Sequence, residues 1–345
     1  MRSNFYLEQG IENWPLPVAR VKHEELNPFI KDGVEMYVLL GYEAPYGGMK
    51  SYAALGMLRN ALESGVYQKG DGLIEATSGA FGLPLVNFAL TGSFGASEVV
   101  LVMNNDVPIG KSVAPFLAGA STRFPEGTLS GIATARKLGG GGWKPDGQWK
   151  RPENGLLNLD QYANPANSHF YHRFAAPKVF GSVGAIDVLV SPVGTGGTLI
   201  GFSKFFRERT DKLLVVGAMC AKGTEVPGVR DLDKMAEITQ PWREALDVRI
   251  EVEQKLAYLC SAWFHWLMGI TPGVSSGLDY FAALRFLAGL KKAQELDSVR
   301  NKKGTIRVLI VFHDGFRPYV VDRFLANLLT EWQKPSTAPL PSKFL

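Results

Sequence analysis

The feature that most constrains this chain is a glycine-rich turn between an apolar run and a segment of helical periodicity. The stretch SPVGTGGTLIGFSKFF, residues 191–206, contains four glycines and two threonines. Residues 186–190 are predicted to form a buried strand, and residues 199–207 carry apolar side chains at helical spacing. Such a turn leaves backbone N–H groups free at the positive end of a helix dipole, where glycine lets an anion approach. The stretch predicts either a phosphate site or an ordinary tight strand-to-helix turn.

The spacing of this turn argues against two common nucleotide sites. A P-loop carries a lysine directly before its serine or threonine, and the dinucleotide pattern spreads three glycines over six residues. Residues 191–206 fit neither pattern. ATP and NAD are therefore poor candidates, and at this point the identity of the phosphate stays open.

Length and composition indicate a globular protein of one large or two smaller domains. The chain has 345 residues, 46% of them hydrophobic and 20% charged, which excludes a disordered chain. The net charge of +4 is small, and the basic cluster at residues 300–303 precedes a strand-like run, so we predict no nucleic-acid surface. Cys220 and Cys260 give neither a disulfide framework nor a zinc pattern, which favours a reducing compartment.

The sequence contains no apolar segment of signal-peptide or membrane-span length, so we predict a cytoplasmic protein that does not bind a membrane. His169 and His172 have a spacing of three residues that could hold a metal ion. A third ligand at useful spacing does not accompany them, and we predict no metal site.

Strands alternate with helices along the chain, which is typical of parallel sheets covered by helices. Strands are predicted at residues 36–40, 98–103, 186–190, 213–218 and 306–312, and helices at residues 51–64 and 278–290. The stretch LGGGGWKPDGQWKRPENG, residues 138–155, is predicted to be a loop near a boundary between two lobes. A Pro- and Ser-rich tail follows Trp332.

Three further segments each have an ordinary structural explanation when taken alone. Lys50 follows a glycine-rich turn before a helix, where most lysines are simply exposed to solvent. Thr77 or Ser78, in LIEATSGAFGLPL, would cap a helix, and so would Ser275 in GVSSGLDYFAALRF. The functional alternative is that the Thr-Ser-Gly turn holds a carboxylate with its hydroxyls and N–H groups.

Taken together and in order, these motifs resemble the cysteine synthase and cystathionine β-synthase family of fold-type II pyridoxal phosphate-dependent enzymes. The resemblance runs from about residue 15 to residue 322. The motifs that carry it are Gly47-Gly-Met-Lys50, Glu75-Ala-Thr-Ser-Gly79, Asp160-Gln-Tyr-Ala-Asn-Pro-Ala-Asn167, Gly194-Thr-Gly-Gly-Thr198, Val226-Pro-Gly-Val-Arg230 and Gly273-Val-Ser-Ser-Gly277. The second, fifth and sixth of these motifs are most similar to the B-type cysteine synthases, and Asp-Gln-Tyr is similar to cystathionine β-synthase.

The resemblance implies a two-lobed α/β fold like that of the tryptophan synthase β subunit, in which each lobe is a mostly parallel twisted sheet covered by helices. Residues 43–160 would form a smaller, mobile lobe, residues 1–42 and 161–330 the larger lobe, and residues 331–345 a tail. It also implies a homodimer. The segment AYLCSAWFHWLMGI, residues 257–270, is apolar on every side, which predicts a cover by its own chain, a subunit interface or an apolar substrate tunnel.

The resemblance assigns roles to individual residues of this chain. Lys50 matches the lysine that joins the cofactor aldehyde as a Schiff base and later acts as general base. Ser275 matches the neutral hydroxyl that faces the pyridine nitrogen, and His313-Asp314 follows the last strand, where the family places residues near the pyridine edge. The implied phosphate site is Gly194, Thr195, Gly196, Gly197 and Thr198, and the implied site for the substrate carboxylate is Thr77, Ser78, Gly79 and Gln161.

One departure from the family pattern lies in the carboxylate turn. The family usually has Thr-Ser-Gly-Asn-Thr-Gly, whereas this chain has Ala80 and Phe81 after Gly79. The asparagine that usually contacts the cofactor's ring oxygen and the substrate is absent, and the loss of such a bond costs about 1.5 to 3 kcal/mol. We therefore expect an altered substrate or a weak activity.

The implied reaction is β-replacement on serine or an O-activated serine through an aminoacrylate. The sequence leaves the leaving group and the nucleophile open. Two alternatives remain: β-elimination of the serine dehydratase or desulfhydrase kind, and a non-catalytic family member that acts through a partner. Because Lys50 is retained, the catalytic interpretations are favoured.

Overall fold

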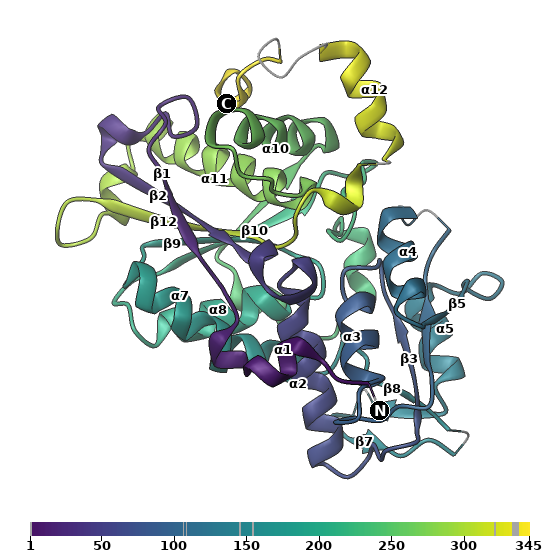
Figure 1. Ribbon diagram of the computed structural model, residues 1–345. Helices are drawn as coiled ribbons and strands as arrows, with labels where there is room; N and C mark the ends of the chain where they lie inside the picture. The colour runs from purple at the N-terminus through teal and green to yellow at the C-terminus, as the bar shows by residue number, and fades with distance from the viewer. Residues whose placement is uncertain are drawn as a thin grey trace.

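A computed structural model describes residues 2–105, 107, 109–144, 146–153, 155–320, 322–332 and 338–345. The chain forms two lobes, each built around a sheet of six mostly parallel strands with helices against it (Figure 1). In the described part of the chain, no helix is both long and apolar enough to cross a bilayer.

The larger lobe contains the sheet with strand order β1-β2-β12-β9-β10-β11. Its strands are β1 (Val18–Val21), β2 (Val34–Leu40), β9 (Val188–Pro192), β10 (Leu214–Cys220), β11 (Val248–Val252) and β12 (Ile306–Phe312). The β1–β2 pair is antiparallel and the other pairs are parallel. Helices α7 (Ala176–Val183) and α8 (Gly197–Arg207) cover one face, and α10 (Gln254–Met268) and α11 (Val274–Lys292) cover the other (Figure 1). Burial on both faces explains why these strands are almost continuously apolar.

The smaller lobe contains the sheet with strand order β5-β4-β3-β8-β6-β7. Its strands are β3 (Gly72–Ala76), β4 (Val99–Val102), β5 (Ser121–Arg123), β6 (Gly141–Trp143), β7 (Trp149–Lys150) and β8 (Leu156–Asn158). Its helices are α2 (Lys50–Glu63), α3 (Gly82–Ala89), α4 (Ile109–Leu117) and α5 (Gly131–Leu138). The remaining α-helices are α1 (Phe5–Gln9), α6 (Ala166–Phe170), α9 (Trp242–Ala245) and α12 (Arg323–Trp332).

The five strands predicted from the sequence are present as β2, β4, β9, β10 and β12, and their boundaries move by at most two residues. The prediction of a simple loop at residues 138–155 was wrong. This segment contains the antiparallel pair β6–β7 and lies within the second sheet rather than between the lobes. Trp143 and Trp149 pair across the two strands, edge to face, with ring centroids 5.3 Å apart. This cross-strand aromatic pair stabilises a hairpin that the glycines and prolines of the segment concealed.

The apolar helix α10 is covered in part by the C-terminal end of the chain. The indole N–H of Trp263 donates a hydrogen bond to the Pro339 carbonyl over 3.0 Å, and the Tyr258 ring packs on Phe324 with centroids 4.8 Å apart. On its solvent side, Trp266 is 55% exposed. A cover by its own chain thus accounts for the apolar face around Trp263, and this face gives no support to a subunit interface.

Candidate active site

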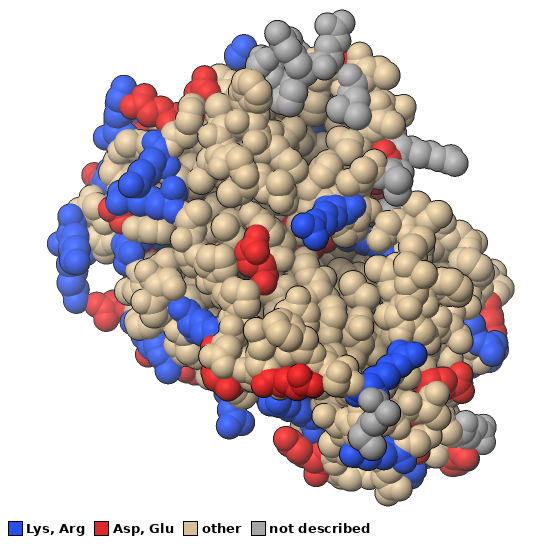
Figure 2. All heavy atoms as spheres, viewed as in Figure 1, with Lys and Arg blue, Asp and Glu red and all other residues tan. Residues whose placement is uncertain are grey.

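A cavity of about 620 Å³ lies between the two lobes. The face of the molecule in Figure 2 is hollowed between the lobes, with Lys or Arg side chains at the rim. Every site residue predicted from the sequence lines this one cavity: Lys50, Thr77, Ser78, Gly79, Gln161, Gly194, Thr195, Gly196, Gly197, Thr198 and Ser275. The fold therefore brings together residues as far apart in the sequence as Lys50 and Ser275, which are separated by 225 positions.

Lys50 is the first residue of α2 and its amine points into the cavity. The turn before it is fixed from the larger lobe, because the Met49 N–H donates to the His313 carbonyl over 2.9 Å. The Lys50 Nζ lies 3.1 Å from Thr195 Oγ1. Burial lowers the pKa of the Lys50 amine from 10.5 to about 8, although the Glu75 carboxyl opposes this shift. An amine with such a pKa has a substantial neutral, nucleophilic fraction near neutral pH.

The glycine-rich turn between β9 and α8 lines the cavity beside Lys50. Gly196 has a φ of +85°, a left-handed conformation that residues with a side chain rarely adopt. The N-cap residue Gly196 has no side chain, and apart from the Gly197 N–H, which lies 3.4 Å from Thr195 Oγ1, the first N–H groups of α8 are available to a ligand at the positive end of the helix dipole. Thr195 Oγ1 accepts a hydrogen bond from Asn167 Nδ2 over 3.1 Å, which fixes the position of this hydroxyl. The arrangement has the free N–H groups and the helix dipole that favour an anion such as a phosphate.

The Thr-Ser-Gly turn follows β3 at the edge of the cavity. The Gly79 N–H donates to Thr77 Oγ1 over 2.9 Å, so the turn is held by its own threonine. Gln161 Nε2 donates to the Ala76 carbonyl over 2.8 Å and brings the Gln161 side chain beside the same turn. Gly79 has a φ of +108°, and a Cβ at this position would lie 2.5 Å from the Lys111 Cβ. The turn is therefore packed directly against Lys111 of helix α4.

Phe81, the residue that departs from the family pattern, lines the cavity but is only 1% exposed. Its ring belongs to the hydrophobic core of buried residues that includes Leu85 and Leu101. It therefore contributes to the stability of the smaller lobe as well as to the shape of the cavity.

A buried polar cluster at one end of the cavity joins the two lobes. Ser275 Oγ donates to Asp314 Oδ1 over 3.1 Å. Asp314 Oδ2 accepts from Lys111 Nζ over 3.1 Å and from the Tyr319 hydroxyl over 2.8 Å. The side chains of Lys111 and Asp314 are only 2% and 10% exposed. Because Lys111 comes from the smaller lobe and Asp314 from the larger one, their ion pair crosses the cleft.

Sequence reasoning missed several residues of the cavity. Lys111 lies in the stretch IGKSVAPFL, where a single lysine among apolar residues gave no signal. Arg230 belongs to one of the motifs that carried the family resemblance, yet no role was given to it; its guanidinium lies 5.0 Å from the centre of the Tyr162 ring, and both residues line the cavity. Ser130, which caps α5, donates a hydrogen bond to Glu237 of the other lobe.

Comparisons with known proteins agree with this geometry. A family model described as pyridoxal-phosphate dependent enzyme matches residues 9–299. Cysteine synthase B of Salmonella typhimurium and that of Escherichia coli are each 32% identical over 282 residues, which covers 81% of this chain and 86% of theirs. The chain therefore belongs to the pyridoxal-phosphate-dependent enzymes, and within them to the cysteine synthase family.

Solved structures show the same fold. A hydrogen sulfide-producing enzyme of Fusobacterium nucleatum superimposes with a TM-score of 0.74 at 20% identity, over 92% of this chain and all of that one. An O-ureido-L-serine synthase gives 0.71 at 19% identity, over 92% of this chain and 94% of the other. The predicted family, the two-lobed α/β fold and the cofactor are thereby confirmed.

The residues of the cavity fit pyridoxal phosphate. The cofactor needs an amine for its aldehyde and an anion site for its phosphate. The amine of Lys50 and the N-terminus of α8 meet in this cavity, because Thr195 Oγ1 lies 3.1 Å from Lys50 Nζ and 3.4 Å from the backbone nitrogen of Gly197, the first residue of α8. Gly196 adopts a backbone conformation that only glycine takes readily, which keeps this anion site open.

Proposed function

We propose that this enzyme catalyses β-replacement on serine or an O-activated serine. The observation that carries the proposal is the meeting, in one cavity, of a buried lysine amine, an anion site and a carboxylate-binding turn. When bound, pyridoxal phosphate supplies an electron-withdrawing ring that makes the bonds at Cα and the β leaving group of an attached amino acid labile.

We assign the cofactor aldehyde to Lys50 and the cofactor phosphate to residues 194–198. The lowered pKa of Lys50 supports both parts of its role. Its neutral amine is a nucleophile for the aldehyde, and once a substrate amine has replaced it, the same neutral amine accepts the substrate's Cα proton. Thr195 Oγ1, within hydrogen-bond distance of Nζ, positions this amine.

We assign the substrate carboxylate to Thr77, Ser78 and Gly79, together with Gln161. The turn has N–H groups and hydroxyls at the edge of the cavity, and both lobes contribute to its surroundings. Binding a carboxylate here would orient Cα toward Lys50 and exclude water from the reacting bonds.

The departures at Ala80 and Phe81 support an altered donor or nucleophile. Ala80 lines the cavity where the family has an amide, so one hydrogen bond to bound ligands is missing there. Because Phe81 is part of the hydrophobic core, Ala80→Asn is the variant that tests this point without disturbing the fold. We expect it to raise the formation of cysteine from O-acetylserine and sulfide.

The decisive experiment offers serine, O-acetylserine and O-phosphoserine to the purified holoenzyme, with and without sulfide. A β-substituted amino acid in the presence of sulfide is the expected product, and Lys50→Ala should form none. Release of pyruvate and ammonia without any replacement product would assign the enzyme to β-elimination instead. Absence of both products with every donor, whether the added nucleophile is sulfide, a thiol amino acid or an amine, would leave a non-catalytic member of the family.

We further propose a cytoplasmic homodimer in which residues 43–160 form the mobile lobe and residues 1–42 and 161–330 the larger one. Sedimentation of the holoenzyme tests the dimer: a monomer at micromolar concentration would exclude it. The mobility of the smaller lobe predicts that a bound amino acid protects its cavity-facing backbone from hydrogen exchange.

A further inference from the structure

In the polar cluster at the Ser275 end of the cavity, the Ser275 hydroxyl is not free to donate a hydrogen bond to a cofactor's ring nitrogen. The Ser275 hydroxyl donates its proton to Asp314 Oδ1. Ser275, His313 and Asp314 all line the cavity. A hydroxyl that donates to a carboxylate has no second proton to give to a ring nitrogen. In this chain the serine therefore reaches the cavity together with a carboxylate.

The contacts of Asp314 leave it able to accept one more hydrogen bond. A carboxylate has about four lone-pair sites on its two oxygens. Asp314 Oδ2 accepts from Lys111 and from Tyr319, and Oδ1 accepts from Ser275. One site on Oδ1 remains for a ligand in the cavity. Lys111 Nζ forms an ion pair with Oδ2 of this buried carboxyl group at 3.1 Å.

Three titratable side chains beside Asp314 have pKa values shifted toward their neutral forms. Burial, and then the charge of Lys50, lower the pKa of His313 to about 4. Burial, and then the charge of Asp314, raise the pKa of Asp279 well above its usual value. Burial also raises the pKa of Tyr319. The ion pair at this end of the cavity is the one between Lys111 Nζ and Asp314 Oδ2, which lie 3.1 Å apart.

We infer that Asp314, rather than Ser275, is the partner of the cofactor's ring nitrogen and keeps that nitrogen protonated. The inference rests on the cofactor placement proposed above, with Lys50 at the aldehyde and α8 at the phosphate. An unprotonated pyridine nitrogen and a carboxylate are both acceptors and repel each other, whereas a protonated nitrogen donates to the carboxylate. Asp314 therefore selects the protonated ring.

A protonated ring would withdraw electrons from Cα more strongly than a neutral one. The site would then make the Cα–H bond labile even in amino acids that lack a leaving group. We expect exchange of the Cα proton of L-alanine with solvent. Lys50 takes the proton from Cα, the proton exchanges with deuterium oxide, and Lys50 returns a deuteron to the same carbon. No bond other than Cα–H is broken, and no oxidant or reductant is consumed.

The test is the protonation state of the ring nitrogen, measured by nuclear magnetic resonance in holoenzyme rebuilt with cofactor that is isotope-labelled at that nitrogen. The free cofactor, titrated through its own protonation, supplies the two reference signals. The natural enzyme should show the protonated signal near neutral pH, and Asp314→Ser the unprotonated one. Glu35→Ser, which removes a carboxylate outside the cavity, should leave the protonated signal unchanged.

A further variant guards against a folding defect, because Asp314→Ser leaves the Lys111 ammonium buried without its partner. The double variant Asp314→Ser/Lys111→Met removes both charges and should show the same unprotonated signal. In deuterium oxide, each Asp314 variant should exchange the Cα proton of L-alanine at least about tenfold more slowly than the natural enzyme.

Two results would overturn the inference: an unprotonated ring nitrogen in the natural enzyme, or a protonated one in the folded Asp314 variants. Borohydride reduction of the same samples separates this failure from a failure of the proposed function. A pyridoxyl group on Lys50 together with an unprotonated nitrogen refutes the role of Asp314 and leaves the cofactor placement intact. A pyridoxyl group elsewhere refutes the placement itself, and with it this inference.

Discussion

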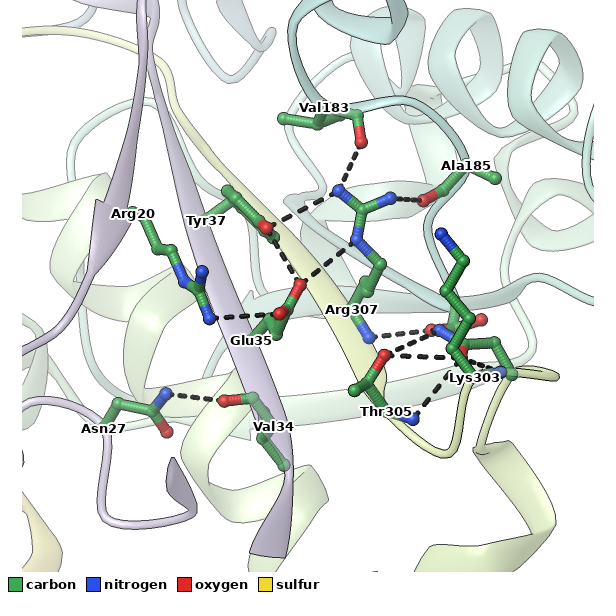
Figure 3. A network of polar contacts seen from close by, with 12 residues as sticks. Arg20, Asn27, Val34, Glu35, Tyr37, Val183, Ala185, Lys303, Thr305 and Arg307 are labelled. Carbon is green, nitrogen blue, oxygen red and sulfur yellow. Dashed lines mark hydrogen bonds and ion pairs between the residues drawn. The ribbon is translucent and has the colours of Figure 1, made fainter. Parts of the chain in front are cut away.

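Two carboxylates of this protein accept almost the same set of hydrogen bonds in very different surroundings. Glu35 accepts from Arg20 over 3.0 Å and from the Tyr37 hydroxyl over 2.9 Å, and it pairs with Arg307 at 3.4 Å (Figure 3). Asp314 likewise accepts from one cation and from a tyrosine hydroxyl, and in addition from a serine. Each cluster thus has one acid, a tyrosine and basic partners.

The two clusters differ in burial and in the parts of the fold that they join. The side chains of Glu35 and its partners Arg20 and Arg307 are between 24% and 48% exposed, and these residues lie on the neighbouring strands β2, β1 and β12. Lys111 and Asp314 are 2% and 10% exposed and join α4 of the smaller lobe to the end of β12 in the larger one. The Glu35 cluster connects strands of one sheet, whereas the Asp314 cluster lines the cavity between the lobes.

The comparison teaches that the surroundings, rather than the set of residues, decide what such a cluster does. An ion pair in contact with water contributes about 0 to 1 kcal/mol, because solvent screens it. A buried ion pair contributes little net stability, but removal of one partner is costly since it leaves an unpaired charge. Buried charges beside a cavity are available to a ligand. Because burying them costs free energy and adds little stability, their presence there indicates a function.

The largest predicted difference is between the stabilities of the variants Lys111→Met and Arg20→Met. Loss of the Lys111 ammonium leaves the Asp314 carboxylate buried without its counter-ion, so we expect a loss of about 3 to 5 kcal/mol in the free energy of unfolding. Arg20→Met should cost about 0 to 1 kcal/mol. Chemical denaturation of both cofactor-free variants measures the two values. Equal losses would show that burial does not separate the clusters.

The second difference concerns pH and Lys50. Its pKa is about 8 in the folded protein and 10.5 when exposed, so between these values the unfolded chain holds a proton that the folded one lacks. The cofactor-free protein should therefore gain stability as pH rises from about 8 to 10.5, by roughly 3 kcal/mol in total. Subtraction of the curve for Lys50→Met, in which the other groups still titrate, isolates this gain. A difference that does not depend on pH would refute the shift.

The third difference separates two glycines with left-handed backbones. Gly196 in the phosphate turn has a φ of +85°, and Gly223 on the surface has a φ of +79° with open space around it. Alanine at either position carries a similar backbone cost, but only at Gly196 would the added Cβ distort the anion site, where it lies 3.0 Å from Trp242. Gly196→Ala should bind pyridoxal phosphate about tenfold more weakly, or about 1.4 kcal/mol. Fluorescence titration of both variants measures this, and equal affinities would mean that the turn does not hold the phosphate.

The smallest predicted effect is that of Glu35→Gln. The amide keeps its size and loses its charge at a partly exposed position, so stability should fall by about 0 to 1 kcal/mol. Cofactor affinity and the visible spectrum of the holoenzyme should not change. A change in the spectrum would show that the Glu35 cluster is coupled to the cavity, and the contrast between the two clusters would then fail.

The parts of the fold and site that could be predicted from the sequence are those that depend on residues close together in the chain. The glycine turn, α2 after Lys50 and the apolar strands are local patterns, and the structure contains each of them close to its predicted bounds. The β6–β7 hairpin was missed because a pair of tryptophans, rather than its glycines, determines it.

The Asp314 cluster could not be predicted in the same way. Lys111 and Asp314 are 203 residues apart, and their contact depends on how the two lobes pack together. No periodicity or turn signal near either residue encodes that contact. The expectation that a neutral serine faces the ring nitrogen followed from one motif, and the structure adds a carboxylate beside it.

The central claim is that Lys50, one of the lysines that line the cavity, carries the cofactor. Borohydride reduction of the holoenzyme followed by peptide mapping tests it directly, because reduction fixes the cofactor to whichever amine holds it. The account predicts the pyridoxyl mass on the peptide that contains Lys50 and an unmodified Lys111, whose amine is engaged by Asp314 and Tyr319. A pyridoxyl group on Lys111 or on any other lysine would contradict it.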